Sequence, residues 1–184
     1  MIALLKQSGN YKQIQRKINN KTMQKDGKIM LTTSLISAGL LGGLFTLIYF
    51  LEQPIAEWFP RWVDDIQIGL MLLSLWLMVS TSIRSANSLS PSMNAFKLIL
   101  LGLLVSIGGF FAYFIFLFIH SKATGLDFKD LTAGLMGKNI FFLAVAALVS
   151  VLVTINLKIK DKFLGNIVEV LLIAAVIFLL IKLA

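Results

Sequence analysis

Glu169 is the one carboxylate of this sequence that is expected within an apolar, membrane-crossing segment. It stands beside Val168 and Val170, where an ionised side chain costs roughly 3 kcal/mol unless it is paired, hydrated or protonated. Lys97 and Lys162 are expected on the same side of the membrane and are possible partners. The sequence therefore predicts for Glu169 either a structural, paired or hydrated carboxylate or a proton or ion relay.

The other titratable residues offer little for catalysis. His120 is the single histidine and there is no cysteine, so thiol chemistry, disulfides and thiolate metal sites are excluded. A metal would have to be held almost entirely by carboxylates. Asp64 and Asp65 are adjacent, so on a helix they point in different directions and make a poor acid and base pair. We expect no catalytic residues, no metal site and no cofactor.

The elements that carry these residues follow from hydropathy. Hydrophobic residues make up 58% of the 184 and charged residues 14%, with a mean hydropathy of +0.86, far from soluble composition. Five apolar segments approach or exceed the length needed to cross about 30 Å of hydrocarbon. They cover residues 29–51, 66–83, 95–119, 139–157 and 163–183. The sequence predicts an all-α integral membrane protein with a transmembrane domain over 29–184 and about five spans. The second segment is short, and its alternative is a re-entrant or surface segment.

Charge predicts the orientation. Of the 17 Lys and Arg residues, twelve fall on the N-terminal side of the expected membrane and five on the other. Because basic loops stay in the cytoplasm, we expect the N-terminus inside and the C-terminus outside, in a bacterial cytoplasmic membrane. The net charge of +8 does not indicate nucleic-acid binding, since most of it lies beside the first apolar segment and the aromatic residues lie in or near the spans.

The first 28 residues form a basic segment that is expected to be an amphipathic helix at the inner surface. Tyr11, Ile14 and Ile18 follow the spacing i, i+3, i+7. The basic residues of the other faces are Lys12, Arg16, Lys17 and Lys21. The first interpretation is an anchor on anionic lipids of the inner leaflet, and a docking surface for an acidic partner is the alternative.

Aromatic residues mark the opposite surface. Pro54 is expected to begin a short helix that sets Trp58 and Trp62 at the level of the lipid headgroups. After Asp127, a second short surface helix should carry Phe128. Anchoring in the interface is the first interpretation and contact with another protein the second. The three prolines are expected between spans, so no proline break is predicted inside one. They are Pro54, Pro60 and Pro91.

Small residues repeat every four positions in three spans, and such faces let helix backbones approach closely in lipid. In the first span Gly39 and Gly43 form a GxxxG pair beside a second stripe. That stripe comprises Ser34, Ala38, Gly42 and Thr46, and the other spans contribute Gly102 with Ser106, and Ala146 with Ser150 and Thr154. We expect these faces mainly to pack within the chain, leaving one of them for an external partner.

These features favour a non-catalytic, multi-pass membrane protein that serves as a structural or assembly subunit of a membrane complex. The alternatives are a small oligomeric transporter or channel with Glu169 as relay, a membrane-perturbing effector and, last, an intramembrane enzyme. The expected partners are anionic lipids together with other membrane proteins or further copies of the chain.

Overall fold

The computed structural model describes the backbone of residues 2–129, 131–132, 139–158, 167 and 170–171, and the side chains of this set from Met23 onward except that of Asn139. These residues form helices and contain no strand. The helices are α1 (Ile2–Trp58), α2 (Val63–Leu89), α3 (Ala95–Thr124) and α5 (Asn139–Lys158). All four are long and apolar enough to cross a membrane.

The four helices contain the first four expected spans. The short second segment belongs to a continuous helix of 27 residues, which is long enough for a full crossing. Nearly all of the fifth segment, 163–183, lies outside the described residues, as does Glu169. The count of about five spans and the orientation therefore stay predictions.

Helix α1 differs from expectation at both of its ends. It runs for 57 residues without a break, so the basic segment and the apolar segment 29–51 belong to one helix. That the first half of this helix lies on the membrane surface stays a prediction. At the other end α1 continues through Pro54 to Trp58, so this proline begins no new helix and does not lie between spans. A proline within a helix removes the backbone hydrogen bond to the residue four positions before it, and Pro54 does so four residues before the end of α1.

Local sequence explains the bounds of α3. The side chain of Asn94 caps its start by accepting a hydrogen bond from the backbone N–H of Phe96, and asparagine is among the best residues for this role. Gly125 ends it with a φ of 74°, a left-handed conformation that glycine adopts without steric cost. Two residues later Asp127 accepts from the N–H of Lys129 and starts the expected surface helix, in which 128–129 and 131–132 are described as helical.

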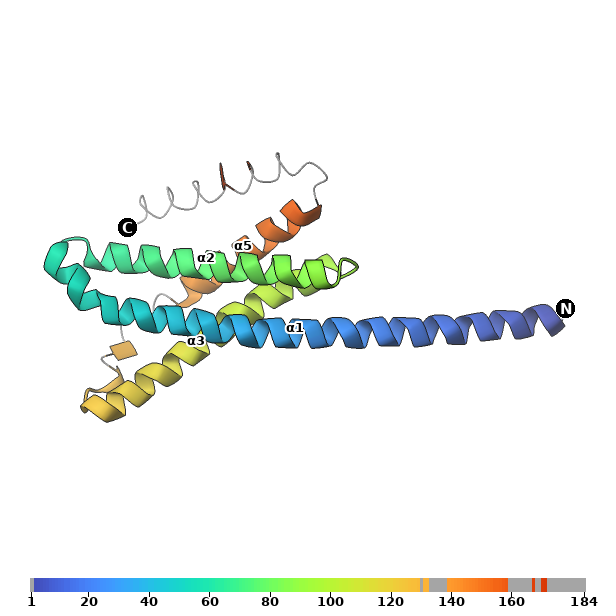
Figure 1. Cartoon of the computed structure of the whole chain (residues 1–184), viewed down its shortest axis with the longest axis horizontal. Helices are drawn as coiled ribbons and strands as arrows, with labels where there is room; N and C mark the ends of the chain where they lie inside the picture. The colour runs from blue at the N-terminus through green and yellow to red at the C-terminus, as the bar shows by residue number, and fades with distance from the viewer. Residues whose placement is uncertain (1, 130, 133–138, 159–166, 168–169, 172–184) are drawn as a thin grey trace.

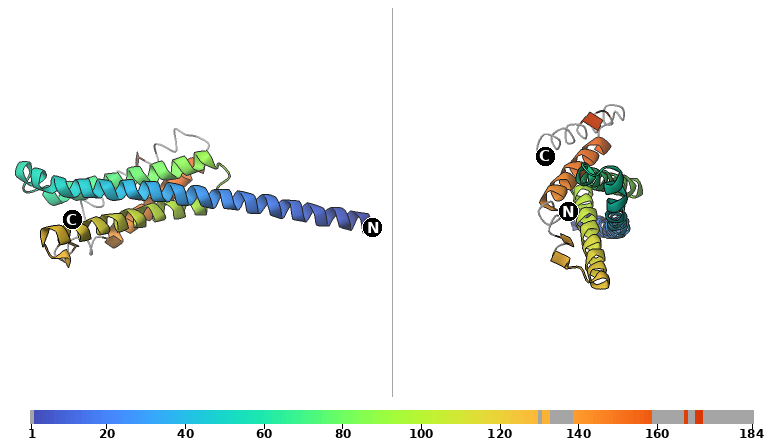
Figure 2. Two further views of the ribbon diagram at one scale, coloured as in Figure 1. Left: turned by 60° about the horizontal axis from the view of Figure 1, so that its bottom comes forward. Right: turned by 90° about the vertical axis from the view of Figure 1, so that its left-hand side faces the viewer.

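Helices α1 and α2 form an antiparallel pair, and α3 crosses α1 obliquely (Figure 1). α1 packs most extensively on α3 and α2, and α5 packs on α3 and α2. Figure 2 shows the same helices from two further sides. Aromatic rings join three helices at the centre. The ring of Phe45 lies 5.2 Å from that of Phe110 and 6.5 Å from that of Phe142.

The structure separates the two stripes of small residues on α1. Ser34, Ala38 and Gly42 are buried, and a Cβ on Gly42 would lie 2.6 Å from the Cβ of Ala112 on α3. Gly39 and Gly43, the GxxxG pair, are exposed and have nothing within 4 Å of such a Cβ. The fourfold stripe thus brings α1 onto α3, whereas the GxxxG face takes no part in packing among the described residues.

The small-residue face of α5 packs inward as expected. Ala146, Ser150 and Thr154 are each at most 2% exposed. A Cβ on Gly102 of α3 would overlap the Ser150 hydroxyl, so α3 and α5 approach each other at a position that admits only hydrogen.

Candidate functional site

Asp26 is the charged residue that the described bundle buries, with 3% of its surface exposed. It lies on α1 three residues before the apolar segment 29–51, at the end of the bundle where α2 turns into α3. This end is called the Asp26 end below, and the opposite one the Trp58 end. A buried carboxylate destabilises a fold unless it is paired and hydrogen-bonded, so its partners decide what the group does.

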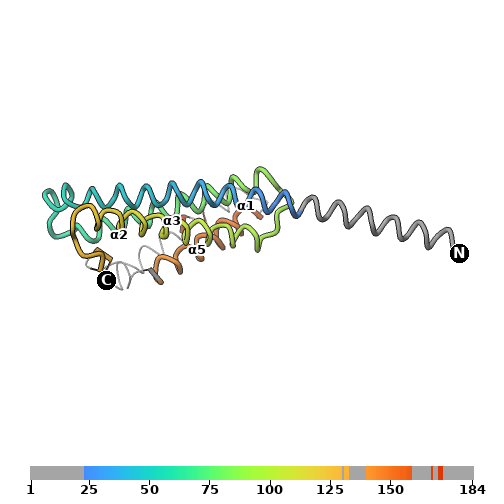
Figure 3. Tube along the Cα trace, turned by 90° about the horizontal axis from the view of Figure 1, so that it is seen from below, coloured from blue at the N-terminus to red at the C-terminus, as the bar shows by residue number. Residues whose placement is uncertain are grey.

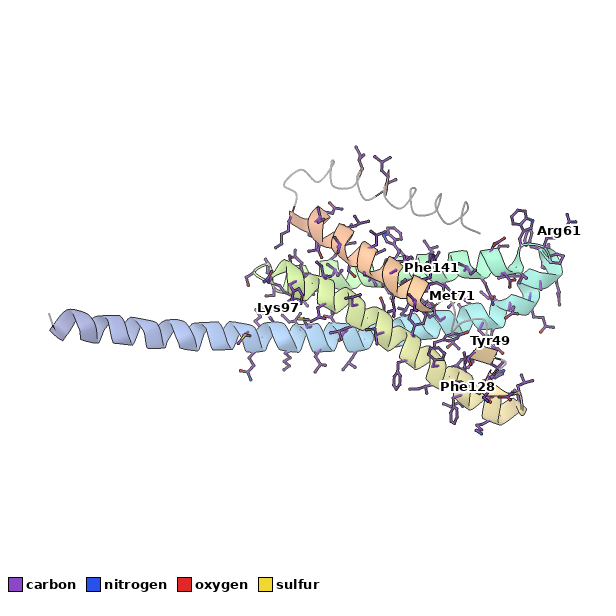
Figure 4. All side chains as sticks on the ribbon, turned by 180° about the vertical axis from the view of Figure 1, so that it is seen from behind. Tyr49, Arg61, Met71, Lys97, Phe128 and Phe141 are labelled. Atoms are coloured by element: carbon purple, nitrogen blue, oxygen red, sulfur yellow. The ribbon has the colours of Figure 1, made fainter. Side chains whose placement is uncertain are left out.

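Lys97 provides the charge partner. Its Nζ lies 2.7 Å from Oδ2 of Asp26 and donates a hydrogen bond to it. Lys97 is in the first turn of α3, where the positive end of the helix dipole disfavours a cation and favours an anion. The Asp26 carboxylate therefore compensates both the ammonium group and the helix end. Figure 4 shows Lys97 at the start of α3 beside α1.

Ser90 completes the arrangement from the turn between α2 and α3. Its hydroxyl donates to Oδ1 of Asp26 over 2.8 Å. The turn is fixed because the backbone N–H of Ser90 bonds to the Ala86 carbonyl and the N–H of Met93 bonds to the Ser90 carbonyl. Asp26, Ser90 and Lys97, here named the Asp26 clamp, thus fasten α1 to the turn and to α3.

The clamp has the chemistry of a structural ion pair. Both carboxylate oxygens accept a hydrogen bond from a fixed donor, which leaves the group little freedom to exchange protons or bind a ligand. The described residues contain no group of three or more His, Asp or Glu side chains that could hold a metal ion. The arrangement is suited to fixing the direction of α1.

A pairing of Lys97 with Glu169 was one possibility from the sequence, and it stays a prediction. Lys97 pairs with Asp26, and Glu169 lies outside the described residues. The sequence contained a signal for Asp26 that our interpretation did not use. Four-residue steps back along the buried stripe, from Gly42 through Ala38 and Ser34, reach Met30 and then Asp26.

The aromatic residues of the Trp58 end are exposed. Trp58 ends α1 and Trp62 precedes α2, and both side chains are more than half exposed. Arg61 lies between them, at the far end of the bundle from Lys97 (Figure 4). Asp64 and Asp65 occupy the first turn of α2, where the helix dipole favours negative charge, so a local electrostatic role accounts for both.

His120 and Phe128 make contacts that sequence reasoning missed. The His120 ring stacks on Phe116 at 5.7 Å and meets the edge of Tyr49 at 5.6 Å, so it joins α3 to α1 within an aromatic cluster. Phe128 packs edge-on against Phe118 at 5.8 Å and is partly buried. It therefore holds the surface helix against α3 in addition to any contact with lipid.

The predicted lipid-surface residues Lys12, Arg16, Lys17 and Lys21 lie on the N-terminal half of α1, and their side chains are outside the described set. The backbone of this half continues α1 past the turn between α2 and α3 (Figure 1). Figure 3 shows the bundle from below, with α1 drawn in colour from residue 23 onward. Comparison with protein-family models, characterised proteins and solved structures gave no match to this chain.

Proposed function

We propose that this chain is a non-catalytic, multi-pass subunit that holds or positions other proteins in a membrane complex. The observation that carries the proposal is the continuous helix α1, which joins a basic segment to a transmembrane segment and is fastened to the bundle by the Asp26 clamp. Such a helix links the position of the bundle in the membrane to the position of anything that binds its N-terminal half.

The interior of the bundle supports a scaffold more than a conduit. The hydroxyls of Ser106 and Ser150 donate to the carbonyls of Gly102 and Ala146, each within its own helix, so they are used for local bonding. The buried charge of Asp26 is paired with Lys97. Aromatic rings and leucines fill the space between α1, α3 and α5.

The proposal includes the topology expected from charge, with the N-terminus in the cytoplasm, five crossings and the C-terminus outside. Reporter fusions at Lys12, Lys122 and Ala184 test it. The fusion at Lys12 should report an inside position and those at Lys122 and Ala184 outside positions. An inside signal at Ala184 together with an outside signal at Lys122 would mean four crossings, with the last apolar segment not crossing the membrane.

The direct test of the subunit role is purification from native membranes in mild detergent, with stoichiometry from native mass spectrometry. The proposal expects a partner at a fixed ratio that survives washing. The matched comparison is a chain lacking residues 2–22, because it retains the bundle and the Asp26 clamp. A chain that purifies alone or only with its own copies would contradict the subunit role and favour the channel or the membrane-perturbing effector.

One observation favours a transporter or channel as the second candidate. The buried Trp76 Nε1 and Thr154 Oγ1 have no hydrogen-bond partner in the described part of the chain, and they lie on α2 and α5, which pack together. Buried polar atoms without partners are uncommon and suit contact with water or an ion. In that function Glu169 would be the relay, and proton- or cation-driven flux in proteoliposomes is the test.

A further inference from the structure

We propose that the Asp26 clamp holds the basic half of α1 away from the lipid surface, so that it binds an apolar groove with an acidic rim on a soluble protein. The inference rests on the proposed subunit function and names the chemistry of the partner. It replaces the expectation that this segment lies on anionic lipid.

The first step concerns direction. A helix that crosses the membrane in residues 29–51 can lie along the surface in residues 2–28 only if it bends sharply between them. α1 has no such break. Gly27 is the place where a bend costs least, because glycine weakens a helix. Asp26 is the residue before it, and Lys97 and Ser90 hold it against the bundle.

The second step concerns distance. At 1.5 Å per residue, residues 2–25 reach about 36 Å beyond the clamp. Attraction to anionic headgroups falls off within a Debye length, about 8 Å at physiological salt. Lys28 is the last residue before the apolar segment 29–51, so distances from the membrane surface are counted from it. Lys21 lies about 10 Å from Lys28 along the helix axis, and Lys12 lies about 24 Å from it. Most of the basic charge therefore lies too far out to be explained by the lipid surface.

The third step concerns the partner. The spacing of Tyr11, Ile14 and Ile18 puts them on one face of a helix, and Lys and Arg occupy positions around them. An amphipathic helix of this kind fits a groove with an apolar floor, and its charges match an acidic rim. Nucleic acid would pair with the basic residues but offers no apolar groove for the stripe.

The position of the helix is tested with the full chain in nanodiscs containing anionic lipid. The sequence has no cysteine, so Asn10→Cys accepts a single fluorophore. We expect brominated lipids to leave its fluorescence unchanged, because residue 10 lies about 27 Å beyond Lys28. With Asp26→Asn the label should be quenched at least twofold, whereas the matched Lys28→Met should behave like the parent. Quenching in the parent, or none with Asp26→Asn in protein that still elutes as a single species, would overturn the proposal.

The chemistry of the groove is tested in the same nanodiscs with calcium-loaded calmodulin as the probe, since it carries an acidic rim around an apolar groove. We expect binding that Ile14→Glu weakens at least tenfold. Gln13→Glu makes the same charge change away from the stripe and should weaken binding less than threefold. Equal losses for the two variants, or no binding of the probe, would contradict an apolar groove as the partner surface.

These outcomes are separable from those of the subunit test. A stoichiometric partner that survives Ile14→Glu would overturn this inference but leave the subunit function standing, because the bundle would then hold the partner. The chain could also bind calmodulin but purify alone from its native membrane. That result would support the proposed binding surface on α1 and contradict the subunit function.

Discussion

Replacing Lys97 by methionine should destabilise the bundle more than replacing Asp26 by asparagine, although both changes remove the same ion pair. The two partners differ in their access to water. Asp26 is 3% exposed, whereas the side chain of Lys97 is 32% exposed. The partner left behind is therefore a buried anion in one variant and a partly hydrated cation in the other.

The magnitudes follow from these exposures. Lys97→Met leaves the Asp26 carboxylate buried with a hydrogen bond from Ser90 alone, and an uncompensated buried charge costs about 3 kcal/mol. Asp26→Asn keeps the shape and an acceptor for Ser90, and the Lys97 ammonium can turn to water, so we expect a loss of about 1 kcal/mol. The double variant has no buried charge and should lose about 2 kcal/mol less than the sum of the two single losses.

Unfolding in mixed micelles of mild detergent and dodecyl sulfate measures these differences, with the three tryptophans as fluorescent reporters. Lys28→Met is the matched control, because Lys28 is exposed two residues after Asp26 and its loss should change the free energy of unfolding by under about 0.5 kcal/mol. Additive losses in the double variant, or a larger loss for Asp26→Asn than for Lys97→Met, would refute the clamp as described.

Three further predictions concern packing and the relay. Gly42→Leu should cost at least about 2 kcal/mol in the same assay, because the added side chain meets α3, while Gly43→Leu, which faces open space, should cost under about 0.5 kcal/mol. Gly102→Ala should destabilise the contact between α3 and α5, and Ser150→Ala should recover part of that loss by removing the hydroxyl that the methyl group would strike. In proteoliposomes, the parent chain should show no more proton- or cation-driven flux than empty vesicles, and Glu169→Gln should not change this. Flux through the parent chain that this substitution abolishes would favour the transporter.

Much of the fold could be predicted because lipid imposes a simple rule. A backbone in hydrocarbon must satisfy its own hydrogen bonds, so each long apolar segment becomes a helix. The segments expected at 95–119 and 139–157 correspond to α3 (Ala95–Thr124) and α5 (Asn139–Lys158). The extent of α1 was harder to predict, because no residue of its sequence decides whether the basic and the apolar half form one helix or two.

The candidate site was predicted only in part. Lys97 was singled out as an ion-pair residue, and it does form an ion pair, but with Asp26. In the sequence Asp26 is only the single acid of a basic segment. Pairing between residues 71 positions apart depends on where the turn between α2 and α3 meets α1, and no local pattern contains that information.

Sequence by itself determined that the chain is helical, that its apolar segments are long enough to span a membrane, and that small residues lie on particular faces. Only the tertiary structure decided which faces meet. In α1 both stripes of small residues allow close approach, but Gly42 faces α3 and Gly43 does not. The physical reason is that lipid is as apolar as a helix interface, so hydrophobicity does not distinguish the two faces, and the choice follows from shape complementarity with the neighbouring helices.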